Sequence, residues 1–147
     1  MEMKYYAKDV EGLRAIETKY PGVYTVEDLY DALTRSWCLE TCAPRLRHLW
    51  SPEDMTVGQC SVTAFLAQDI FGGKVYGIPL PEGGFHCYNV VGDAVFDLTS
   101  AQFHGEELVY IGNPEQFREE QFKDEEKKQR YELLCAALAA ASCVDYA

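Results

Sequence analysis

Three residues of the sequence have the side chains of a nucleophile, a base and an orienting acid: Cys60, His86 and Asp97. Cys60 is predicted to lie in the first turns of a helix, where the helix dipole lowers the pKa of a thiol and makes it a better nucleophile at neutral pH. A histidine can move the proton of such a thiol, and a carboxylate can hold the imidazole in one tautomer. The three residue types therefore predict acyl chemistry on a thiol, if the fold brings them together.

Each of the three residues also has a purely structural interpretation. Cys60 could be a buried free cysteine, which is common in protein cores. His86 could be a surface histidine or a satisfied core histidine, and Asp97 could cap the turn that follows it. The choice between these interpretations depends on the elements that position the residues.

The helix that carries Cys60 is predicted from a capping box and a glycine stop. Thr56 is placed at the cap and Gln59 at the third helical position, and the helix is expected to run to Phe71 and to end at Gly72-Gly73. Apolar side chains lie nearly all round it, which is typical of a central, buried helix.

A hairpin is predicted to bring His86 and Asp97 onto one face of a sheet. The strands Phe85–Val91 and Ala94–Leu98 flank Gly92-Asp93, a two-residue turn with glycine first, as a type II′ turn requires. Because this turn fixes the pairing and side chains alternate along a strand, His86 and Asp97 become diagonal neighbours on the same face. The pattern leaves open whether the start of the helix reaches that face.

The remaining elements complete an α+β domain that is expected to span residues 1–147, with the central helix packed on an antiparallel sheet and a further helix at the C-terminus. They are a helix capped by Thr25 and Asp28, loops or short helical turns after Pro44, strands at Lys74–Leu80 and Leu108–Ile111, and a surface helix after Pro114.

Composition restricts the class of protein and of partner. The 147 residues include 48% apolar and 25% charged residues, which is the profile of a globular domain. Thirteen basic against 24 acidic residues leave a formal net charge of −11, which argues against binding to nucleic acid or to an anionic membrane surface.

The N-terminal residues lack the apolar segment of a signal peptide, and the longest apolar stretch is shorter than the roughly 20 residues that span a bilayer. A cytoplasmic location is therefore expected, and the six cysteines are expected to be thiols rather than disulfides. No cofactor is predicted. A metal site is kept as an alternative, formed by Cys38 and Cys42 with Cys60 and His86, because zinc requires four converging ligands.

Several strings of the sequence resemble the YunG family of small bacterial proteins. They are Gly-Gln-Cys-Ser-Val-Thr-Ala at 58–64, Asp-Ile-Phe-Gly-Gly at 69–73, Gly-Phe-His-Cys-Tyr-Asn at 84–89 and Val-Phe-Asp-Leu-Thr-Ser-Ala-Gln-Phe at 95–103. The resemblance covers residues 29–134. The chain departs from the family pattern at Cys87 and Tyr88, where the family usually has tyrosine and tryptophan.

The order of a cysteine at a helix start, a histidine on a strand and an aspartate on the next strand is similar to that of the transglutaminase-like and papain-like superfamily. This similarity implies hydrolysis or acyl transfer on an amide or ester of a small molecule or peptide, with Cys60 attacking, His86 carrying the proton and Asp97 orienting His86. Cys87 faces away from His86 on its strand and is excluded as the nucleophile.

The same similarity implies an oxyanion site that contains the backbone N–H of Cys60 and one further donor, for which Trp50 and Gln59 are candidates. In the alternative interpretation Trp50 only packs and Gln59 only closes the capping box. The main rival function is an inactive binding module on the same scaffold, whose acidic surface would favour a basic partner. Substrate identity and oligomeric state are left open by the sequence.

Overall fold

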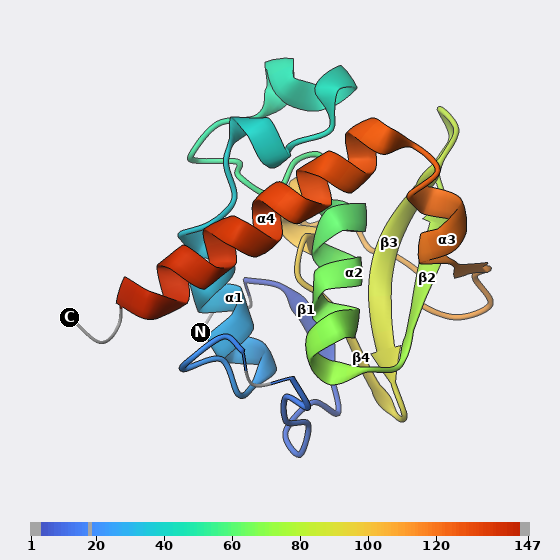
Figure 1. The fold of residues 1–147 in the computed structure, drawn as a ribbon. Helices are drawn as coiled ribbons and strands as arrows, with labels where there is room; N and C mark the ends of the chain where they lie inside the picture. Colours follow the sequence, from blue (N-terminus) through green and yellow to red (C-terminus); the bar gives the residue numbers. More distant parts are fainter. Residues whose placement is uncertain (1–3, 18, 145–147) are drawn as a thin grey trace.

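The strands form one antiparallel sheet in the order β1-β4-β3-β2-β5 (Figure 1). A computed structural model describes residues 4–17 and 19–144, the last two of these by their backbone alone. The strands are β1 (Tyr6–Lys8), β2 (Lys74–Pro79), β3 (Phe85–Val91), β4 (Ala94–Asp97) and β5 (Glu115–Gln116). The helices are α1 (Val26–Thr34), η1 (Leu39–Thr41), η2 (Pro44–Leu49), α2 (Cys60–Phe71), η3 (Ser100–Phe103), α3 (Arg118–Gln121) and α4 (Glu125–Val144). The architecture is α+β, as predicted.

Helix α2 lies between the sheet and α4, which crosses it in Figure 1. Its side chains are buried all round, as the sequence pattern predicted. Two buried hydrogen bonds fix its position: Asn89 Nδ2 of β3 donates to Ala64 O at 2.8 Å, and Trp37 Nε1 donates to Thr63 Oγ1 at 2.9 Å. The central helix is therefore held by polar contacts as well as by packing.

The predicted capping box at the start of α2 is wrong. The helix begins at Cys60 rather than just after Thr56, whose buried hydroxyl has no hydrogen-bond partner among the described residues. Gly58 explains the difference, because its φ of +71° is left-handed and cannot belong to a right-handed helical turn. The helix ends at Phe71, as predicted, before Gly72 with a φ of +80°.

Gly58 also allows two segments to approach closely. A Cβ atom at this position would lie 2.5 Å from Cys42 Sγ and 2.9 Å from Ala43 N. Ala43 N–H donates to Gly58 O at 2.9 Å, so the segment leading into η2 is held against the turn before Cys60. The spacing that puts η2 beside the start of α2 thus depends on a residue without a side chain.

The predicted hairpin is confirmed, including its register. Val91 pairs with Ala94, and Gly92 has a φ of +60° while Asp93 does not enter the left-handed region, as in a type II′ turn. The ladder between β3 and β4 ends at Asn89 and Phe96. Beyond it Asp97 pairs with Tyr6 of β1, a strand that the sequence analysis missed.

The prediction of a strand at Leu108–Ile111 is wrong. In the described chain this segment pairs with no strand, and Tyr110 instead stacks on Tyr6 with ring centroids 4.1 Å apart and meets Tyr88 edge-on at 4.9 Å. Its run of apolar residues combines Tyr110, which covers the sheet, with Val109 and Ile111, which are 69% and 85% exposed. The short strand β5 pairs with β2 and forms the edge of the sheet opposite β1.

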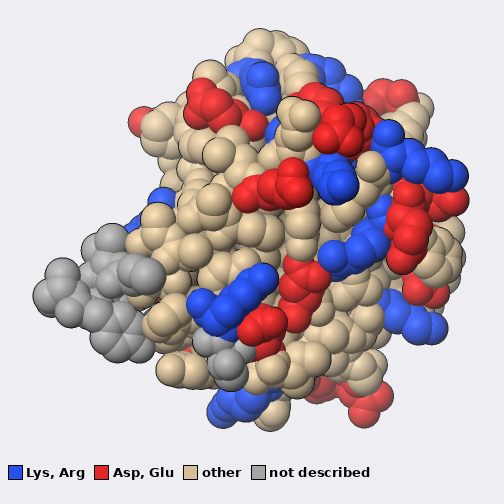
Figure 2. Space-filling model, viewed as in Figure 1, with Lys and Arg blue, Asp and Glu red and all other residues tan. Residues whose placement is uncertain are grey.

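The segment after Pro114 is more divided than the predicted surface helix. It forms β5, α3 and α4, with Asp124 accepting from the N–H groups of Glu126 and Lys127 at the start of α4. Leu134 and Leu138 of α4 are fully buried. On the face shown in Figure 2, acidic and basic side chains are interspersed rather than separated. None of the helices within the described ranges has the length and apolarity needed to cross a membrane.

Candidate active site

The structure joins His86 to Asp97 by a short, buried hydrogen bond. His86 Nε2 donates to Asp97 Oδ2 at 2.6 Å, and each side chain is at most 1% exposed. The edge of Phe103 meets the imidazole ring with centroids 4.6 Å apart, which restrains the ring on its other side. With Nε2 occupied, Nδ1 is the ring nitrogen that remains for a further partner.

Asp97 uses both of its carboxylate oxygens. Oδ2 accepts from His86 and from the hydroxyl of Tyr110 at 2.8 Å, while Oδ1 accepts from the backbone N–H of Thr99 at 3.2 Å and its hydroxyl at 3.4 Å. Asp97 therefore caps the following turn and also holds the histidine. The two roles that the sequence analysis treated as alternatives are performed by different oxygens.

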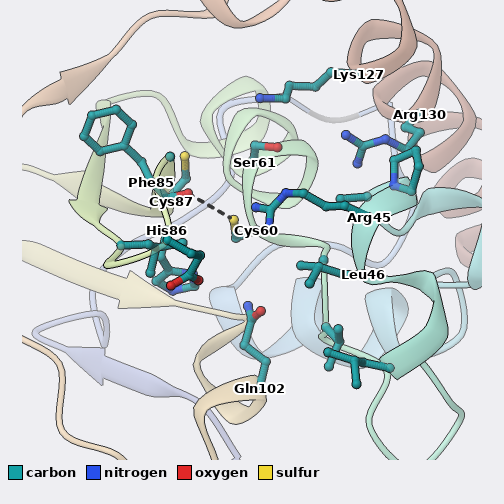
Figure 3. A pocket seen from close by; sticks show the side chains of 18 of the residues that line it. Arg45, Leu46, Cys60, Ser61, Phe85, His86, Cys87, Gln102, Lys127 and Arg130 are labelled. Carbon is teal, nitrogen blue, oxygen red and sulfur yellow. Dashed lines mark hydrogen bonds between the residues drawn. The ribbon is translucent and has the colours of Figure 1, made fainter.

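Cys60 is the first residue of α2 and is partly exposed. Its Sγ atom lies 3.8 Å from the carbonyl oxygen of Phe85, and the side chains of His86 and Cys87 lie beside it (Figure 3). The helix start therefore reaches the beginning of β3, where the chain passes from His86 to Cys87. This is the approach that the sequence pattern left open.

The hydrogen bonds at Cys60 favour its ionised form. The bond from the Cys87 thiol lowers the pKa of Cys60 most, burial acts in the opposite direction, and the hydrogen bond and charge of His86 lower the pKa further. The result is a pKa well below the ordinary value of a thiol. The partner Cys87 is buried against α2, and its pKa is raised by its hydrogen bond to Cys60 and by burial.

His86 is shifted towards its protonated form. Burial lowers the pKa of His86, but the hydrogen bonds to Asp97 and Cys60 and the charges of both outweigh burial and raise the pKa to about 10. At neutral pH the arrangement therefore favours a Cys60 thiolate beside a His86 imidazolium. Such a pair provides a nucleophile and a proton donor at the same place.

The Cys60 sulfur opens onto a pocket of about 760 Å³. This volume is within the range of small-molecule sites, about 300–1,000 Å³. The pocket lies between η2, the start of α2, the start of β3, η3 and the first turn of α4, and its lining includes Arg45, Leu46, Phe85, Gln102 and Lys127 (Figure 3).

Trp50 and Gln59 have their donors engaged away from this pocket. Trp50 Nε1 donates to Met55 O at 2.9 Å. Gln59 Nε2 donates to Cys38 O at 3.1 Å, and Gln59 Oε1 is buried without a hydrogen-bond partner in the described part of the chain. Their position thus favours the alternative in which both residues support the structure.

The sequence analysis missed four residues that surround the candidate set: Thr99, Gln102, Tyr110 and Cys87 as a hydrogen-bond partner of Cys60. Gln102 lies in the pocket wall and donates one amide N–H to Thr99 O at 3.0 Å. Only Thr99 could have been inferred, because a residue two positions after an aspartate at a strand end is a common partner of that carboxylate.

No group of three or more histidine, cysteine and acidic side chains within the described ranges is placed to hold a metal ion. Cys42 is buried, and its thiol contacts the carbonyl oxygen of Ala43 at 3.4 Å. The metal alternative therefore has no converging ligand set to support it.

Comparison with known proteins identifies the family. The model of the YunG protein family matches residues 25–142. The protein YunG of Bacillus subtilis (strain 168), described as uncharacterised, is 38% identical over 84 residues, which cover 57% of this chain and 70% of that relative. No solved structure matches the chain. The chain belongs to the YunG family.

Proposed function

We propose that the protein is a thiol-dependent acyl hydrolase or acyltransferase that acts on an amide or ester. Cys60 is the nucleophile, His86 carries the proton and Asp97 orients His86. The observation that supports this proposal is that the Cys60 sulfur, open to the pocket, lies beside His86, which a buried hydrogen bond joins to Asp97. A cysteine with a structural role only would not need a neighbouring histidine that is itself oriented by a buried carboxylate.

The proposed reaction has two steps. The Cys60 thiolate attacks the substrate carbonyl carbon, a carbon–sulfur bond forms and the carbonyl π electrons move to the oxygen. When the carbonyl re-forms, the bond to the leaving group breaks and the His86 imidazolium gives its proton to the departing amine or alcohol. Water or another acceptor then attacks the thioester, with neutral His86 as base, and the thiolate is released.

The negative oxygen of the intermediate is stabilised at the start of α2. The first N–H groups of a helix have no partner within the helix, and the dipole favours negative charge there. In this proposal Cys60 contributes its own N–H, as the resemblance to transglutaminase-like enzymes implies. Gln102 is the candidate for a second donor, because its amide lies in the pocket wall and faces Cys60 in Figure 3.

The relation to transglutaminase-like and papain-like enzymes belongs to this proposal. Three features support it: the nucleophile is the first residue of a central helix, the histidine and the acid are on neighbouring antiparallel strands, and the acid binds the far nitrogen of the imidazole. Similar arrangements on unrelated folds perform similar chemistry, so the proposal depends on the geometry of the site rather than on the fold.

Acylation of Cys60 is the direct test. The purified protein is incubated with a panel of activated esters and amides, and mass spectrometry measures the acyl adduct on the Cys60 peptide. Wild type is expected to acylate and turn over, whereas Cys60→Ala should lose turnover with a packing loss on the order of 1 kcal/mol. Cys135→Ala is the matched control, because it removes another partly exposed thiol outside the pocket.

A wild type that forms no adduct faster than Cys60→Ala across the panel would contradict the proposal. The pocket would then be better explained by the binding-module alternative. Loss of turnover in Cys135→Ala as well would show that the effect of Cys60→Ala is not specific to this site.

A further inference from the structure

Arg45 differs from the other arginines in having no acceptor. The sequence contains six arginines, and the others bind carbonyls or carboxylates: Arg14 with Glu11 O, Arg35 with Asp31 O, Arg47 and Arg130 with Glu126, and Arg118 with Asp69. Within residues 4–17 and 19–144 the guanidinium of Arg45 makes neither a hydrogen bond nor an ion pair.

The position of Arg45 suggests the missing partner. Arg45 lies on η2 in the pocket wall, and in Figure 3 its guanidinium is directed towards Cys60. Lys127 lines the same pocket from α4, close enough that its charge lowers the pKa of Cys87. The close approach at Gly58 holds the start of η2 in this place. Two cations on different elements therefore face the region around the nucleophile.

The acidic residues of the pocket are mostly engaged elsewhere. Glu126 binds Arg130 at 2.8 Å, Asp54 binds His104 at 3.0 Å, and Asp124 accepts from the backbone at the start of α4. Glu82 lies on the exposed turn between β2 and β3. Apart from Glu82, the pocket charges that the described residues leave without an ion-pair or capping partner are Arg45 and Lys127, and the Lys127 ammonium also donates to Gln121 Oε1.

We infer that Arg45, assisted by Lys127, selects an acyl donor that carries a carboxylate near the reacting carbonyl. The inference rests on the proposed function, because it assigns the substrate class of the same site. A guanidinium binds a carboxylate through two parallel hydrogen bonds, which fixes the orientation of the donor as well as attracting it. Leu46 and Phe85 offer apolar surface to the carbon chain between the carboxylate and the carbonyl.

Two alkylating reagents of nearly equal size test this inference without a known substrate. Iodoacetate carries a carboxylate and iodoacetamide does not, and both alkylate a thiolate with loss of iodide. The rate of each at the Cys60 peptide is measured by mass spectrometry at low salt. Arg45→Gln is expected to lower the ratio of the iodoacetate rate to the iodoacetamide rate about fivefold, as expected for one exposed charge at short range.

Further variants separate charge from structure. Arg45→Lys keeps a cation and should retain part of the ratio, whereas Lys128→Gln removes a cation of α4 outside the pocket and should leave it unchanged. Added salt should lower the ratio in wild type and have less effect in Arg45→Gln, because screening acts only where the charge is present.

The outcomes distinguish this inference from the proposed function. If Cys60 reacts with iodoacetamide no faster than the other thiols, the proposed function and the inference both fail. If Cys60 is the fastest thiol but Arg45→Gln leaves the ratio unchanged, the proposed function stands and the selection of a carboxylate by Arg45 is wrong. A fall of the ratio in Lys128→Gln as large as in Arg45→Gln would also contradict the inference.

Discussion

Helix α2 carries a polar cluster at each end, and the two clusters differ in one respect. Near its C-terminal end, Asp69 accepts from Arg118 at 2.7 Å and from the hydroxyl of Tyr131. Arg118 also donates to Phe65 O at 3.1 Å, and aromatic rings surround its guanidinium. Every polar partner of this cluster is another part of the protein.

The cluster at the N-terminal end is built from similar parts, and both clusters border a pocket, since Asp69 and Arg118 line a separate one of about 330 Å³, but only the N-terminal cluster holds a thiol. Asp97 is fully engaged, as Asp69 is, yet the Cys60 sulfur faces a pocket. Both clusters contain shifted groups: burial and Asp69 raise the pKa of Tyr131, as Asp97 and Cys60 raise that of His86. A shifted pKa thus does not by itself separate a structural cluster from a candidate active site, whereas access to an ionised nucleophile does.

The largest difference between the two clusters is expected when the same isosteric change is made in both carboxylates. Asp97→Asn is expected to lower the acylation rate of Cys60 roughly 10⁴-fold, as in the serine-protease precedent. Because Thr99 N–H requires an acceptor, the amide oxygen takes the place of Oδ1 and the NH₂ faces His86. This forces Nε2 to accept and puts the proton on Nδ1, which is the wrong tautomer.

Asp69→Asn is the matched control and should leave that rate within about twofold, because Asp69 touches no part of the pocket at Cys60. Both rates come from the same measurement of the adduct on the Cys60 peptide. An equal loss of acylation rate in the two variants would mean that the effect is structural. Both clusters would then have a structural role only.

The second test removes the cation of the cluster that contains Asp69. Arg118→Ala is expected to lower the free energy of unfolding by about 2–3 kcal/mol, because it leaves the Asp69 carboxylate and the Phe65 carbonyl short of a charged donor. The rate of Cys60 alkylation should not change. Urea denaturation measures the stability, with Arg45→Ala as control. A similar loss of stability in Arg45→Ala would show that Arg45 is a structural residue after all.

The smallest expected effect concerns the thiol next to His86. In wild type the alkylation rate of Cys60 should reach its plateau well below pH 9.0, the ordinary pKa of cysteine, because the pKa of Cys60 is lowered well below that value and His86 stays protonated up to about pH 10. Cys87→Ala removes a hydrogen bond to the thiolate, so the pKa of Cys60 should rise. When the pH is lowered, the alkylation rate of this variant should therefore start to fall at a higher pH than that of wild type.

The loss in rate on the acidic side should be about two- to tenfold, which corresponds to one ordinary hydrogen bond. Cys135→Ala serves as control, since Cys135 is not a partner of Cys60 and should leave the pH profile unchanged. A profile of Cys87→Ala identical to that of wild type would show that His86 alone lowers the pKa of Cys60.

Much of the site could be predicted because it depends on local patterns. The run of apolar residues before Gly72 predicts α2, and Gly92-Asp93 predicts the hairpin and its register. From the register alone, His86 and Asp97 share a face. The error at the start of α2 arose because Thr56 and Gln59 fit a capping pattern, while a close approach to Cys42 requires a left-handed Gly58.

Contacts between distant segments could not be predicted. The strand β1 was missed because its residues 6–8 are too few to show a pattern, and Tyr110 was assigned to a strand because a short apolar run does not reveal whether a segment has a pairing partner. Gln59 was assigned two possible roles from its neighbours, but its actual partner is the carbonyl of Cys38, 21 residues away.

The sequence by itself determined the residue types of the site and the two elements that carry them. The periodicity of a helix and of a hairpin depends only on residues that are close together in the sequence. Only the tertiary structure decided that Cys60 meets His86, that Tyr110 covers Asp97 and that Arg45 faces the pocket. These contacts join residues 13 or more positions apart. They result from how α2, η2 and the segment after β4 pack on one sheet, and packing depends on the shape of the whole core rather than on any short stretch of sequence.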